Sequence, residues 1–112
     1  SDVRRAVRGR RWTAVPRDTP RRVRGALSWM TPAARRHYLP LWLVEGFADA
    51  DVRGQATFQA RYLVDDPARR ASQLPLFTPG ERHAVAACLR WYAEVDAVDR
   101  ADATAALIHW GA

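Results

Sequence analysis

The stretch Phe77-Thr78-Pro79-Gly80-Glu81-Arg82 decides the fold class, because it carries the start signal of a long helix. Thr78 can accept a hydrogen bond from a free amide of the first turn, and Glu81 can return one to the cap residue. Pro79 falls at the first helical position, where its missing N–H is not needed. Five apolar residues then follow at helical spacing: Val85, Cys88, Leu89, Tyr92 and Val95. The pattern predicts a helix that turns this stripe toward a core.

A matching start, Met30-Thr31-Pro32-Ala33-Ala34-Arg35, lies 47 positions earlier in the chain. It predicts a second helix that runs to about Ala48. Every residue from Tyr38 to Val44 is apolar or proline, and a helix that is hydrophobic all round is typical of a central, buried position. Pro40 lies inside this stretch and removes one helical hydrogen bond, so we expect a kink or a break there.

The remaining segments predict shorter elements. Short helices are expected over 1–11 and 21–29 and from about Asp99 or Asp102 to Trp110, with loops at 13–20 and 49–54. Residues 55–64 can form a helix or an extended segment, and Phe58, Tyr62 and Leu63 are its core candidates. Trp42 and Trp110 lie on apolar faces and are predicted in the core.

These elements together predict an all-α fold. We expect one compact bundle of about four to five helices over residues 1–112, with its central helix kinked at Pro40. The length of 112 residues suits a single domain. Residues 1–20 are interpreted as a basic, loosely attached arm.

Charge is distributed unevenly along the chain. Residues 1–36 hold 11 Arg against two acidic residues, a net charge of +9, whereas residues 37–112 hold seven Arg against ten acidic residues, a net charge of −3. All 18 basic residues are Arg, for which a coding bias toward Arg and Ala is one explanation. That bias does not explain the concentration at one end, which is also typical of contact with nucleic acid or an acidic partner.

Two sets of residues are candidates for binding. The first comprises tryptophans outside the predicted apolar stripes, with a neighbouring arginine, and suits a protein-binding hot spot: Trp12, Arg90 and Trp91. The second is the basic set that would contact phosphates: Arg4, Arg5, Arg8, Arg10, Arg11, Arg21 and Arg22. No helix-turn-helix signature accompanies the basic set.

Catalytic, metal and cofactor chemistry have little support in the residues. The sequence lacks a His-Glu-x-x-His motif, a second cysteine and a phosphate-binding glycine loop, so we predict no catalytic residues, no metal and no cofactor. Cys88 is predicted to be a core cysteine. An enzyme site that combines His37, His83 and Glu45 remains a minor hypothesis. No run approaches the roughly 18 apolar residues of a membrane span, and we expect a cytoplasmic protein.

The order of these motifs resembles a small bacterial family of uncharacterised proteins. The resemblance rests on Trp12 and a Pro-containing loop, then Leu27 to Pro32, Tyr38-Leu39-Pro40, Phe77 to Arg82 and a terminal Ala-Leu-Ile-His-Trp, and it spans residues 12–110. Ala34 departs from the family pattern, in which a nearby glutamate completes the first capping box. The resemblance supports a helical fold and implies no catalytic residues.

Three functions are compatible with the sequence. The favoured one is a non-enzymatic helical module that binds another protein, in the manner of an adaptor or immunity protein. The alternatives are nucleic-acid binding through the Arg-rich first third, and a small enzyme with an unrecognised site. The oligomeric state stays open.

Overall fold

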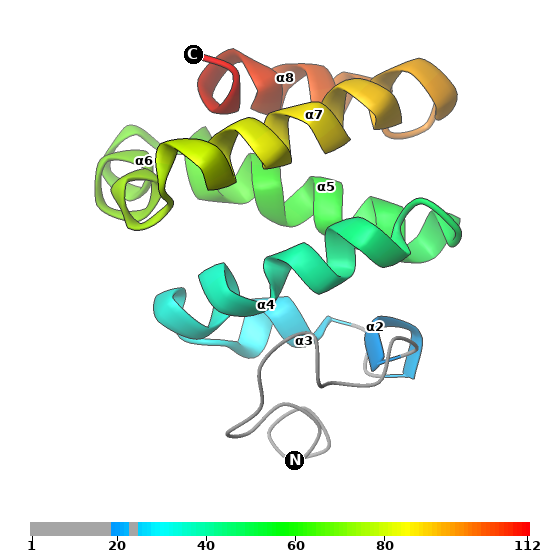
Figure 1. The fold of residues 1–112 in the computed structure, drawn as a ribbon, viewed down its shortest axis with the longest axis horizontal. Coiled ribbons are helices and arrows are strands. Elements are labelled where there is room, and N and C mark those ends of the chain that lie inside the picture. The colour runs from blue at the N-terminus through cyan, green and yellow to red at the C-terminus, as the bar shows by residue number, and fades with distance from the viewer. Residues whose placement is uncertain (1–18, 23–24) are drawn as a thin grey trace.

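The computed structural model describes residues 19–22 and 25–112, which form helices and connecting turns without a β-strand (Figure 1). Two four-residue helices come first, α2 (Thr19–Arg22) and α3 (Ala26–Trp29). Five longer helices follow: α4 (Pro32–Glu45), α5 (Ala50–Asp65), α6 (Pro67–Gln73), α7 (Pro79–Val95) and α8 (Arg100–Trp110). A 3-10 turn, η2 (Leu74–Leu76), joins α6 to α7. The predicted all-α class is confirmed for this part of the chain.

Both predicted Thr-Pro starts are confirmed by their caps. The Thr31 hydroxyl accepts a hydrogen bond from the amide of Ala34 at 3.2 Å and so begins α4. At α7, the Thr78 hydroxyl accepts from the amide of Glu81 at 3.1 Å. The Glu81 carboxylate accepts in return from the amide of Thr78 at 2.8 Å, which completes the capping box.

Helix α4 continues through Pro40 without a break, so the alternative of a broken helix is wrong, whereas a bend stays a prediction. The helix ends at Glu45 rather than near Ala48. The cause lies in the next residues, because Asp49 accepts from the amide of Val52 at 3.1 Å and caps α5.

The loop predicted over 49–54 is therefore wrong. Its two aspartates are the cap and the first turn of α5, where negative charge is favourable, and Gly54 lies inside the helix. Residues 55–64, for which an extended segment was an alternative, belong to the same helix. Thr19 and Pro20, expected in a loop, begin α2.

The core lies between α4, α5, α7 and α8, which Figure 1 shows stacked across the molecule. Trp42 and Trp110 are fully buried, as predicted. The Trp42 indole donates to the Gln55 side chain at 3.2 Å, and the Trp110 indole donates to the carbonyl of Ala60 at 2.8 Å. These bonds satisfy the polar atom that each large ring carries into the core.

The core assignment of Phe58 and Tyr62 is wrong. Their side chains are 57% and 39% exposed, because α5 turns a different face inward. The buried residues of α5 are Val52, Ala56, Thr57, Gln59, Ala60, Leu63 and Val64. On α7, Val95 is also exposed rather than buried. The helical period was predicted for α7 but left open for residues 55–64, and in both helices the inward face depends on the neighbouring helices.

Candidate functional site

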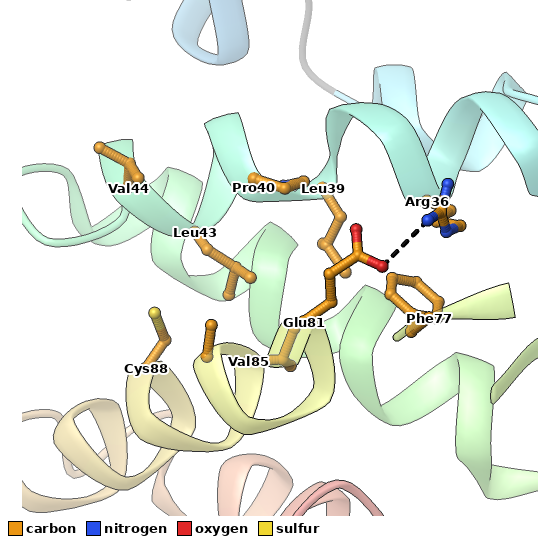
Figure 2. A pocket seen from close by; sticks show the side chains of 10 residues that line it. Arg36, Leu39, Pro40, Leu43, Val44, Phe77, Glu81, Val85 and Cys88 are labelled. Atoms are coloured by element: carbon orange, nitrogen blue, oxygen red, sulfur yellow. Dashed lines mark hydrogen bonds and ion pairs between the residues drawn. The ribbon is translucent and has the colours of Figure 1, made fainter. Parts of the chain in front are cut away.

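The two Thr-Pro helices lie side by side and run in the same direction. Near their starts, the Arg36 guanidinium pairs with the Glu81 carboxylate at 2.9 Å (Figure 2). Near their ends, the Tyr92 hydroxyl donates to the carbonyl of Leu43. Parallel helices must be linked by a return element, and α5 supplies it (Figure 1).

An apolar groove of about 220 Å³ lies between these helices. Figure 2 shows Leu39 and Leu43 of α4 facing Val85 and Cys88 of α7, with the Arg36–Glu81 pair at one end. The groove residues are Arg36, Leu39, Pro40, Leu43, Val44, Phe77, Glu81, Ala84, Val85 and Cys88. Val44 and Ala84 are exposed, so the groove is open to a ligand.

The Arg36–Glu81 pair forms a polar rim. Its side chains are 35% and 39% exposed, so solvent screens the pair and it adds at most about 1 kcal/mol to stability. The amide of Thr78, together with Arg36, holds the pKa of Glu81 below its usual value and keeps the carboxylate charged. Within the described residues the buried Nε of Arg36 has no hydrogen-bond acceptor.

Two aromatic residues lie one helical turn beyond the groove-lining residues Val44 and Cys88, away from the Arg36–Glu81 pair. Phe47 follows Val44 by three residues on the α4 side, Trp91 follows Cys88 by three residues on α7, and the two rings are 4.6 Å apart. The guanidinium of Arg53 lies 5.6 Å from the Trp91 ring and pairs with Asp96 at 2.7 Å. Phe47 and Trp91 remain 41% and 37% exposed, so they form a supported aromatic end to the groove.

Cys88 is half-buried in the wall of the groove and contacts the core with its other side. Burial raises the pKa of its thiol, so the neutral form is favoured and the sulfur contributes apolar surface. Sequence analysis placed Cys88 in the core; it lies instead at the border between core and groove.

A second, polar cleft of about 220 Å³ lies between α7 and the end of α8. Its lining includes Arg82, His83, Arg90 and Trp110. In the described part of the chain, neither arginine nor the histidine is paired with a carboxylate. Arg90 and Trp91 are adjacent in sequence but belong to different surfaces. Trp91 contacts the Phe47 ring, whereas Arg90 lines the polar cleft, so the two candidates face different parts of the surface.

The structure describes only some of the other candidate residues. Trp12, Arg4, Arg5, Arg8, Arg10 and Arg11 lie outside the described residues, as does the helix predicted over 1–11. Arg21 and Arg22 lie in α2, where the Arg22 guanidinium is 3.4 Å from the Thr19 hydroxyl.

The minor enzyme hypothesis gains no support from the geometry. His37 and Glu45 are eight residues apart on α4, a rise of about 12 Å. His83 lines the polar cleft on α7 rather than the groove. Within residues 19–22 and 25–112, no group of His, Cys, Asp and Glu is arranged to hold a metal ion. No helix in the same ranges is long and apolar enough to cross a bilayer.

Neither the groove nor the neighbouring Phe47 was predicted from the sequence. One signal was present, because seven consecutive residues of α4 are apolar or proline, more than a single buried face needs. Val44 is the surplus apolar residue that the groove exposes. Phe47 lies just beyond the end of α4 and carried no periodic signal.

The described residues form an all-helical fold with an open apolar groove between α4 and α7. The profile of the family of unknown function DUF6714 matches residues 1–112, and the chain belongs to this family. The match confirms the resemblance to an uncharacterised family. That the family is bacterial stays a prediction. No curated protein and no solved structure matches the chain.

Proposed function

We propose that this protein is a non-enzymatic binding module that accepts an amphipathic helix of another protein in the groove between α4 and α7. The observation that carries the proposal is the open apolar groove between two parallel helices. An adaptor or an immunity protein would use such a surface to hold or block its partner.

The chemistry of the groove favours a helix as its occupant. Apart from Arg36 and Glu81 at one end, all of its side chains are apolar or, in the case of Cys88, weakly polar. An extended segment would bury main-chain amides and carbonyls there without partners, which costs free energy at each group. A helix satisfies its own main chain and presents apolar side chains at spacings of three and four residues.

The dimensions also suit a short helix. On α7 the surface runs from Glu81 through Cys88 to Trp91, eleven residues whose ten steps rise about 15 Å. A partner helix of three to four turns covers that length. We infer that a bend at Pro40 widens the groove, because Pro40 lines it and proline pushes against the preceding turn.

The two ends of the groove have different roles. Phe47 and Trp91 form a rigid, half-exposed aromatic pair, and such residues dominate the binding energy of many interfaces. Arg36 and Glu81 supply a polar end that sets the direction of a bound helix by charge complementarity.

The test is a selection of displayed helical peptides of about 15 residues against the full chain, followed by fluorescence anisotropy of the selected peptides. We expect enrichment of peptides with apolar residues at i, i+3 or i+4 and i+7. The variant Ala84→Arg should weaken their binding at least about tenfold, since a long charged side chain enters the groove.

The variant Ala87→Arg is the matched control. Ala87 is an exposed alanine on the same helix and lines neither the groove nor the polar cleft. It should bind the selected peptides as the wild type does. Peptides without a helical apolar pattern, or equal binding to wild type and Ala84→Arg, would overturn the proposal.

A further inference from the structure

A second exposed aromatic surface lies on α5, apart from the groove. The rings of Phe58 and Tyr62 are stacked, with centroids 6.3 Å apart and planes 19° from parallel. They lie one helical turn apart and are 57% and 39% exposed. The exposed parts of these two rings offer apolar surface to a planar ligand, most of it on Phe58.

Two arginines flank these rings and carry charge that is not neutralised. The Arg69 guanidinium lies 3.7 Å from the centre of the Tyr62 ring, and that of Arg35 lies 5.8 Å from it. Both are held by main-chain carbonyls, Arg69 by Tyr62 at 2.7 Å and Arg35 by Leu27 at 3.0 Å. Among the residues that the structure describes, neither guanidinium is paired with a carboxylate. The arginines are therefore positioned by the fold but remain available to an anion.

Helix α3, which carries the exposed Trp29, is bonded to α5 and to Arg35. The Gln59 side chain, next to Phe58, donates to the Ser28 hydroxyl at 2.8 Å. Trp29 follows Ser28 and is 83% exposed. Arg35 bonds the carbonyls of Leu27 and Met30 and so encloses the end of α3. We call Trp29, Arg35, Phe58, Tyr62 and Arg69 the aromatic–arginine platform.

We propose that the aromatic–arginine platform binds single-stranded nucleic acid. Unpaired bases stack on aromatic rings whatever their sequence, and arginine guanidiniums contact the phosphates between them. A duplex is the poorer ligand, because its bases are already stacked on one another. The platform includes Arg35 from the Arg-rich first third, whose net charge of +9 over residues 1–36 attracts a polyanion. This charge complementarity favours nucleic acid over an apolar protein segment.

The test is fluorescence anisotropy of labelled 12-nucleotide dT, rU and matched duplex probes with the full chain at low and moderate salt. We expect both single strands to bind more tightly than the duplex. The variants Phe58→Ala and Arg69→Ala should each weaken single-strand binding about tenfold, as expected for loss of one stacked base or its phosphate contact. The ratio of dT to rU affinity distinguishes DNA from RNA as the ligand.

The chain provides matched controls for both variants. Ile108 is an exposed apolar residue on α8, 68% exposed, and Ile108→Ala should bind like the wild type. Arg100 donates to the carbonyl seven residues before it at 2.7 Å, as Arg69 does, but among the described residues no aromatic ring lies under its guanidinium. Arg100→Ala therefore removes one positive charge, as Arg69→Ala does, but at a position outside the platform.

Three results would overturn the platform. The first is that no single strand binds at low salt, and the second is that duplex and single strand bind equally. The third is that Arg69→Ala and Arg100→Ala lose the same affinity while Phe58→Ala loses none. The last result would indicate attraction by total charge alone. The variant Ala84→Arg changes the groove and not the platform, so it should bind nucleic acid as the wild type does. Failure of the platform and failure of the groove can therefore be told apart.

Discussion

The hydroxyl of Tyr92 donates a hydrogen bond to the main-chain carbonyl of Leu43 and so joins α7 to the end of α4. The carbonyl depends on this donor, because the amide of Phe47, four residues on, donates to Val44 instead at 3.3 Å. Burial raises the pKa of Tyr92, so the hydroxyl keeps its proton at any ordinary pH. The bond links the two helices close to Phe47, whose ring lies 5.5 Å from that of Tyr92.

Tyr92→Phe should lower the free energy of unfolding by about 1–3 kcal/mol, because it leaves a buried carbonyl without a donor. Urea denaturation followed by circular dichroism measures the loss. Tyr62→Phe is the control: its ring is partly exposed, and the change should stay within about 0.5 kcal/mol. An unchanged midpoint for Tyr92→Phe would show that this bond does not hold the two helices together.

Gly46 and Gly54 should respond to alanine in opposite directions. A Cβ on Gly46 would collide with the Tyr92 hydroxyl and lie 3.0 Å from the Arg53 Cα, so Gly46→Ala should cost about 1–3 kcal/mol. A Cβ on Gly54 would meet nothing closer than the Asp99 carboxylate at 3.6 Å. Since Gly54 lies inside a helix, Gly54→Ala should add about 0.5–1 kcal/mol. Thermal denaturation of both variants gives the signs, and a destabilised Gly54→Ala would contradict the helix through this position.

Stability should fall in acid through Asp96. The hydrogen bond from Arg53 holds the pKa of Asp96 below its usual value. A carboxylate of this kind stabilises the fold above its unfolded pKa of about 3.9, and the contribution is lost as the pH falls through the lower folded value. Glu81, whose pKa is also lowered, acts in the same direction. Asp99 acts in the opposite direction, because burial raises its pKa.

The melting temperature measured from about pH 6 to pH 2 tests this dependence. Asp96→Asn should show a shallower loss in acid than the wild type, because the amide does not titrate. Glu94→Gln serves as the control, since Glu94 is an exposed acid on α7 whose side chain has no bond to the described residues. Parallel curves for Asp96→Asn and wild type would remove Asp96 from the explanation.

Pro40→Ala should stabilise the protein and weaken peptide binding together. The substitution restores an amide that can donate to the carbonyl of Arg36, and alanine is favoured over proline in a helix interior by about 3 kcal/mol. A straighter α4 would narrow the groove that Pro40 lines. Thermal denaturation and peptide anisotropy measure the two effects, with the exposed Pro75→Ala as the control. A gain in stability with unchanged binding would show that the groove does not depend on a bend.

Local chemistry in the sequence determined where the main helices begin. The Thr31 and Thr78 caps involve only residues within one turn, so each start could be inferred without any knowledge of the rest of the chain. The same local logic identified Trp42 and Trp110 as core residues, because both lie within apolar stretches at helical spacing. It misjudged Asp49, because an aspartate in a segment flanked by glycines suits both a loop and a helix cap.

Only the tertiary structure decided which apolar residues were left on the surface. Phe58 and Tyr62 have the same hydrophobic character as their buried neighbours, and their exposure follows from how α5 meets α4 and α8. The same holds for Val44, which lines the groove between the parallel helices α4 and α7, and for Phe47 and Trp91, whose partly exposed rings contact each other across the same two segments. Helix starts depend on contacts within a single turn, whereas surfaces depend on contacts between segments distant in the chain.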